Sequence, residues 1–112
     1  MGKIGSVSVN CTIKDMSGGY EYEDYVYLWI CSQKPTSHEQ PTYDRTDSYC
    51  ARRTPSDTST GTRTPKLTID TSDLTGRFYV AIGISQRCVA SDSSHIGGAM
   101  DEVWIYAPIT FS

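Results

Sequence analysis

The sequence lacks any apolar run close to the ~20 residues that a membrane-spanning helix needs. It also lacks the basic and apolar opening of a signal peptide. Basic residues are in slight deficit, since 10 Lys and Arg stand against 13 Asp and Glu over 112 residues. An acidic balance argues against a partner held through phosphate contacts. We therefore expect no membrane span and no nucleic-acid partner.

Cysteine and histidine are present, but their spacing does not fit a zinc site. The four cysteines stand far apart, without a CxxC pair and with no His at ligand spacing: Cys11, Cys31, Cys50 and Cys88. In an oxidising compartment they could form two disulfides in any of three pairings. Because no secretion signal is recognisable, we expect four free thiols that act as small apolar side chains.

The chain also lacks the 3.6-residue apolar period of an amphipathic helix. Apolar and polar residues alternate with a period of two instead, between clusters of Gly, Pro, Ser, Thr and Asp, which predicts strands. The expected strands are Val7–Ile13, Tyr25–Cys31, Thr46–Arg52, Lys66–Asp70, Phe78–Ser85 and Glu102–Tyr106, with Ile109–Phe111 after Pro108 as an extension or a seventh strand. Six or seven short strands without helices predict an all-β protein. We expect an antiparallel β-sandwich of jelly-roll type, in a single domain over residues 1–112.

Three long polar segments connect the predicted strands: Ser32–Arg45, Arg53–Pro65 and Gln86–Gly98. Loops longer than ~12–15 residues without secondary structure are uncommon in compact domains. Each segment is therefore either functional or hides an element that the alternation does not reveal.

Strand alternation divides the side chains between two faces. One face collects aliphatic residues into a core: Val7, Val9, Ile13, Val26, Leu28, Ile30, Leu67, Ile69, Phe78, Val80, Ile82, Ile84, Val103 and Ile105. The reverse face of three strands is aromatic: Tyr25, Tyr27, Trp29, Tyr79, Trp104 and Tyr106. Ala81 and Gly83 lie among these rings and would leave a shallow trough.

Aromatic rings with polar tips suit sugar binding, because flat rings stack on the C–H faces of pyranoses while Tyr hydroxyls and the indole N–H bond to sugar hydroxyls. The six aromatic residues are therefore the candidate ligand-binding site. The same pattern also fits two structural roles. Long loops could fold over the outer face and make it a second core, or a partner subunit could cover it.

Catalytic patterns are weak. The segment Gly83–Arg87 lacks the second glycine of a nucleophile elbow, and neither His has a neighbour that suggests a triad. We expect no enzyme activity. Alternation places the Asp101 side chain on the same inward face as Val103 and Ile105. A carboxylate on that face needs a partner, because burying an unpaired charge costs free energy. One interpretation is a Ca²⁺ site, and the other is a hydrogen-bonded loop anchor, which the absence of a DxDxDG-type loop favours.

Two stretches resemble known families. Residues 66–82, KLTIDTSDLTGRFYVAI, contain a strand, a D-x-S-x-L-x-G segment and an aromatic-rich strand. This order resembles jelly-roll domains with a carbohydrate-binding-module-like fold, as in phage tail-associated minor structural proteins and cell-surface adhesins. Residues 98–106, GAMDEVWIY, are similar to the final strand of such domains and of laminin-G-like sandwiches, which often close on I-D-E-V-x-I-Y. The resemblance covers the C-terminal half and aligns Asp101 with an acidic residue that helps hold Ca²⁺ in some members.

The resemblance implies a non-catalytic attachment or decorating module. We expect a protein of the virion surface or phage tail that recognises a glycan or cell-surface polysaccharide through its aromatic face. One alternative is a structural or decoration protein whose aromatic face contacts identical subunits or other virion proteins. Another is an extracellular carbohydrate-binding module secreted by a bacterium.

Overall fold

The computed structural model describes residues 4–14, 22–36, 40–53, 62–88 and 100–112. Within strands it describes the backbone alone at residues 14, 22, 23, 52, 53, 86–88 and 100–104. The described residues contain strands and turns but no helix, so no helix is available there to cross a membrane.

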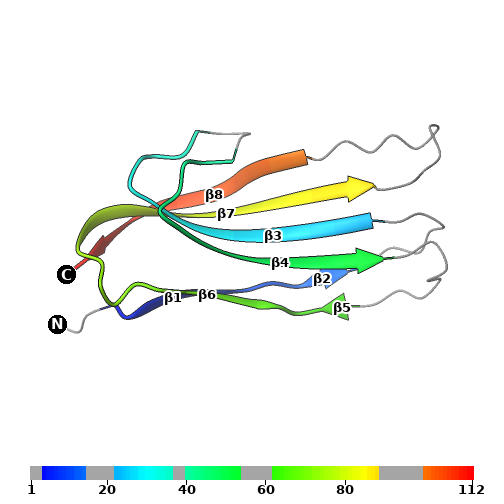
Figure 1. Ribbon diagram of the computed structural model, residues 1–112, viewed down its shortest axis with the longest axis horizontal. Coiled ribbons are helices and arrows are strands. Elements are labelled where there is room, and N and C mark those ends of the chain that lie inside the picture. Colours follow the sequence, from blue (N-terminus) through cyan, green and yellow to red (C-terminus); the bar gives the residue numbers. More distant parts are fainter. Residues whose placement is uncertain (1–3, 15–21, 37–39, 54–61, 89–99) are drawn as a thin grey trace.

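The strands form two layers (Figure 1). The larger layer is an antiparallel sheet with the order β4-β3-β7-β8. The smaller layer is a ribbon in which β1 pairs with β6 and β2 pairs with β5, also antiparallel. The bounds are β1 Ser6–Asn10, β2 Ile13–Lys14, β3 Tyr22–Cys31, β4 Arg45–Arg53, β5 Thr62–Arg63, β6 Lys66–Asp70, β7 Gly76–Cys88 and β8 Met100–Phe111. The all-β antiparallel sandwich is confirmed, and its jelly-roll topology stays a prediction.

The core lies between the two layers and consists mainly of aliphatic residues that alternation predicts, but Ile84 and Ile105, which were also expected in it, are exposed, and Phe111, which was not expected, is buried in it. Its buried members are Val26, Leu28, Ile30, Leu67, Ile69 and Phe111. Half-buried residues from β1, β2, β4, β7 and β8 pack around them, among them Val7, Val9, Ile13, Phe78, Val80 and Ile82. We call the side of the large sheet that faces the ribbon the inner face, and the opposite side the outer face.

Proline explains two differences from the expected strands. The first strand is interrupted at Cys11, whose N–H donates to the carbonyl of Pro65 at 2.9 Å, because Pro65 has no N–H to continue the ladder. At the other end of the chain, β8 runs through Pro108, which lies opposite Tyr79. β8 is the edge strand of the sheet, which is where proline is tolerated within a sheet.

The Asp70–Gly76 segment forms the corner between the two layers. Asp70 accepts a hydrogen bond from the Ser72 N–H at 3.0 Å, and Leu74 N–H donates to the Thr71 carbonyl at 3.0 Å. Arg45, at the start of β4, binds both carboxylate oxygens of Asp73, at 2.6 and 2.7 Å. The D-x-S-x-L-x-G pattern therefore has a structural role in this chain.

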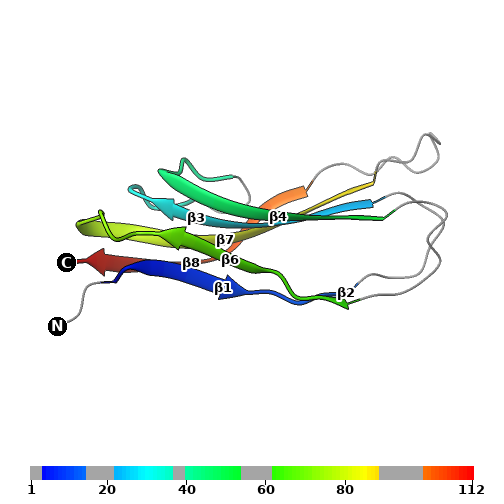
Figure 2. The ribbon, with the colours of Figure 1, turned by 60° about the horizontal axis from the view of Figure 1, so that its bottom comes forward.

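Hydrogen bonds join the two layers along β4. The Asp47 carboxylate of β4 accepts the Thr68 N–H of β6 at 2.8 Å, and Arg45 donates to the Asp70 carbonyl at 2.8 Å. The ribbon thus lies against β4 and β3 (Figure 2), and two aliphatic side chains of β7 and β8 are exposed at the end of the sheet far from the Asp70–Gly76 corner. Ile84 is 44% exposed and Ile105 is 62% exposed there.

Candidate binding face and its loop

The outer face carries the predicted aromatic residues side by side. On β3, the sequence alternation places Tyr25, Tyr27 and Trp29 on this face. The register sets them opposite Ser85, Gly83 and Ala81 of β7. Tyr106 of β8 lies opposite Ala81. The strand pairing therefore brings five of the six candidate residues, including Tyr79, onto one surface.

The rings of β3 stack on one another along the strand. The centroids of Tyr25 and Tyr27 are 5.9 Å apart with planes at 5°, and those of Tyr27 and Trp29 are 5.1 Å apart at 9°. Each face of Tyr27 is therefore occupied by a neighbouring ring. A sugar that stacks needs a free ring face, so this stack of three rings offers a sugar only the ring edges and the free face at the outer end of the stack.

Trp29 is not available to a ligand, because its ring is only 1% exposed. It forms a second small core on the outer face with Cys31 and Ala81, both fully buried, and with the half-buried Tyr27 and Tyr79. The sequence left a ligand trough and a loop-covered core as alternatives. For Trp29 the ligand trough is excluded, because its side chain is buried in this second core.

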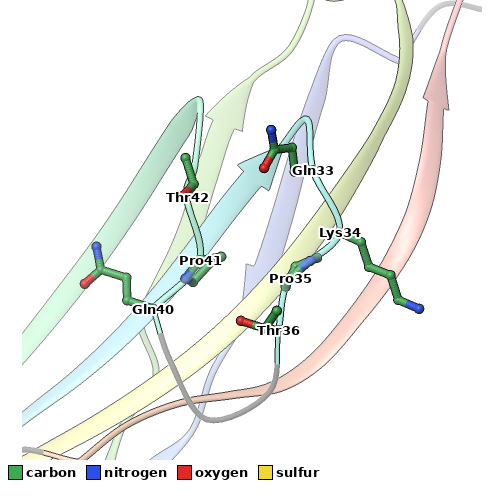
Figure 3. A pocket seen from close by; sticks show the side chains of 7 residues that line it. All are labelled: Gln33, Lys34, Pro35, Thr36, Gln40, Pro41 and Thr42. Carbon is green, nitrogen blue, oxygen red and sulfur yellow. The ribbon is translucent and has the colours of Figure 1, made fainter.

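The connection between β3 and β4 lies in front of the outer face of the sheet (Figure 3). The Lys34 ammonium is 5.9 Å from the ring centroid of Tyr106, which shows that this connection crosses from β3 to β8. Pro35 and Pro41 are buried although the neighbouring loop residues are exposed. We call the described parts of this connection, residues 32–36 and 40–44, the covering loop.

The covering loop is closed at its base by two hydrogen bonds around Asp44. The Asp44 N–H donates to the Ile30 carbonyl at 2.8 Å, and the Asp44 carboxylate accepts the Ser32 N–H at 2.7 Å. The prolines restrict φ on both limbs of the loop. These contacts fix the loop before any ligand arrives.

A hollow of about 190 Å³ opens within the covering loop. Its lining is mostly amide and hydroxyl side chains with two proline rings: Gln33, Lys34, Pro35, Thr36, Gln40, Pro41 and Thr42. In Figure 3 the Lys34 side chain extends away from this group toward β8. The sequence marked Ser32–Arg45 as a segment that is either functional or a missed element, but did not identify these residues, since only the folded loop brings its two limbs together.

The thiol at the covered end of the face is held in its unreactive form. Cys11, Cys31 and Cys50 are free. Burial, and secondly the Asp44 charge, raise the pKa of Cys31 to about 11, so its thiol stays protonated near neutral pH. The Cys88 side chain lies outside the described part of the chain.

The inward placement expected for Asp101 does not follow from the observed register. A bulge in β8 leaves Trp104 without a partner opposite the Ile82–Gly83 step of β7, so that Ile105 pairs with Ile82 but Val103 pairs with Gly83, and the alternation is broken before Asp101 is reached. Asp101 pairs with Ser85, which itself lies opposite Tyr25, a residue of the outer face. The side chains of Asp101 and Trp104 lie outside the described residues, so both proposed roles stay predictions. Among the described side chains, no group of three or more His, Cys, Asp or Glu could hold a metal ion.

Comparison with protein-family models, with curated proteins and with solved structures finds no match for the chain.

Proposed function

We propose that the protein is a non-catalytic attachment module that binds a carbohydrate on the outer face of its large sheet. The observation that carries the proposal is the aromatic outer face, which lies on the side away from the ribbon and over which a polar loop forms a hollow. The sequence resemblance to phage tail-associated and adhesin domains adds the setting, a virion surface or the cell exterior.

The chemistry of this surface suits a sugar better than an apolar partner. Half-buried Tyr25 and Tyr27 lie next to the exposed Thr46, Ser48 and Cys50 of β4, because the register sets Tyr25 opposite Cys50 and Tyr27 opposite Ser48. Hydroxyl groups beside ring edges can bond to sugar hydroxyls while the rings cover C–H groups. Tyr106, which is 40% exposed, extends the surface across β8.

A glycan array probed with the purified full-length chain tests the proposal. We expect binding to a restricted set of glycans, with Kd values in the mM to μM range for a short oligosaccharide. Display of many copies on one particle would raise the effective strength. Tyr106→Ala should weaken binding to the same glycans. Thr62→Ala, which changes an exposed threonine of the ribbon, serves as the control. An array without any bound glycan, probed with multivalent protein, would contradict the proposal.

A structural role is the second candidate, and a separate surface supports it. Ile84 and Ile105 are exposed on the inner face, where the described ribbon does not cover β7 and β8. Exposed apolar patches are typical of association sites. A subunit role predicts an oligomer in light scattering that Ile105→Ser dissociates, and a monomer across the accessible concentration range would exclude it.

A further inference from the structure

We propose that the hollow of the covering loop is the subsite for one uncharged sugar residue at the end of a glycan. This inference rests on the proposed carbohydrate-binding function and gives it a location, a size and a charge preference. It places the first contacts with the ligand on the loop between β3 and β4 rather than on the aromatic rings that the sequence indicated.

The size of the hollow sets the size of the ligand unit. A volume of about 190 Å³ corresponds to about six water molecules at ~30 Å³ each. Pockets for drug-sized ligands occupy ~300–1,000 Å³. The hollow therefore admits one ring, and the rest of a glycan would leave it along the outer face toward Tyr106.

The lining sets the chemistry. The side chains of Gln33 and Gln40 each carry an amide with donors and an acceptor, and Thr36 and Thr42 add hydroxyls, so the hollow can bond to groups that both donate and accept. Vicinal sugar hydroxyls are such groups. Pro35 and Pro41 supply C–H surface for the apolar side of the ring.

The charge pattern favours an uncharged sugar. Lys34 is the one charged residue among the described lining residues. Its ammonium lies over the ring of Tyr106, 5.9 Å from the centroid, and its side chain extends away from the amides in Figure 3. Recruiting it for a carboxylate would break this cation–π contact.

The loop is also built before binding. The two hydrogen bonds at Asp44, the buried prolines and the Lys34 contact hold both limbs in place. Side chains on a fixed loop lose less conformational entropy when a ligand arrives than those on a mobile one. A weak site for one ring can therefore give measurable affinity.

The test is NMR titration of the full-length protein with methyl glycosides of glucose, galactose and N-acetylglucosamine, and with glucuronic and N-acetylneuraminic acid. We expect an uncharged glycoside to saturate at mM concentration and to shift the side-chain amide signals of Gln33 and Gln40. Because one hydrogen bond is lost in each case, Gln33→Ala and Gln40→Ala should each weaken binding about five-fold. Thr62→Ala, on the other layer, should leave the affinity unchanged.

The outcomes separate the two proposals. If a glycan binds, the Gln variants bind it normally and Tyr106→Ala weakens it, then the hollow is not the subsite and the carbohydrate-binding function stands. If the acidic sugars bind more tightly than the uncharged ones, the charge assignment is wrong. If neither the titration nor the array detects any sugar, the function fails and the subsite with it.

Discussion

The burial of Trp29 on the outer face of the large sheet makes a strong prediction about stability. Replacing a fully buried aromatic side chain with Ala costs about 3–5 kcal/mol, and Trp29 is 1% exposed. The variant also loses the stacking on Tyr27. We expect Trp29→Ala to lower the free energy of unfolding by about 4 kcal/mol. With ~2.1 cal/mol/K of unfolding entropy per residue over 112 residues, this corresponds to a fall in Tm of roughly 17 °C.

The measurement is urea denaturation followed by far-UV circular dichroism, which does not depend on the tryptophan signal. Tyr106→Ala is the matched control, since it removes an aromatic ring from the same face, and Tyr106 is 40% exposed. We expect that control to cost about 1 kcal/mol. If Trp29→Ala costs no more than Tyr106→Ala, the Trp29 ring is not buried, and the aromatic face is a ligand platform after all.

Three further predictions concern the thiols, the corner and the turn glycine. Because the pKa of Cys31 is raised from 9.0 to about 11 in the folded state, the protonated thiol contributes its full share to stability below pH 9, and this contribution is lost as the pH rises toward 11. Cys31→Ala should therefore reduce the fall in Tm that thermal melts show at alkaline pH. Iodoacetamide at pH 8 should label the exposed Cys50 long before Cys31. Asp73→Asn should cost at most about 1 kcal/mol by urea denaturation, and the cost should shrink at 1 M salt, since the Arg45–Asp73 pair is partly exposed. Gly76→Ala should cost about 1–2 kcal/mol, because φ is +97° while the space around an added Cβ is open; a neutral result would exclude backbone strain at this position.

Strand alternation predicted the inner core because it depends only on the pleat. Val26, Leu28 and Ile30 alternate without interruption, and all three are buried against the ribbon. The β6 strand has the predicted bounds, Lys66–Asp70. The segment Arg53–Pro65 hid a short element, β5, whose two residues are too few to show a period.

Features that depend on partners in space could not be predicted. The bulge opposite Gly83 shifts the register of β8 relative to β7, and no local pattern in Glu102–Tyr106 marks it. Alternation correctly placed Trp29 opposite the core face, but its burial in a second core depends on neighbours from another strand, such as Ala81 and Tyr79 of β7. In the Ser32–Arg45 segment the sequence shows only two prolines, Pro35 and Pro41, and a proline alone does not show which surface a loop lies against.

The residues that line the hollow of the covering loop are of two kinds, two buried prolines and a group of exposed polar residues. Pro35 and Pro41 are buried, so their rings contribute to packing as well as to the lining of the hollow. Packing alone does not require the two amides and two hydroxyls gathered around the hollow. We therefore expect the two kinds of variant to separate: Pro35→Ala with Pro41→Ala should lower the free energy of unfolding by about 1–2 kcal/mol through lost packing and greater freedom of the unfolded chain. Gln33→Ala with Gln40→Ala should leave stability within about 0.5 kcal/mol, because both changes are at the surface, while weakening sugar binding. If the glutamine pair destabilises the protein as much as the proline pair, the amides belong to the cover, and the loop has no residues set apart for a ligand.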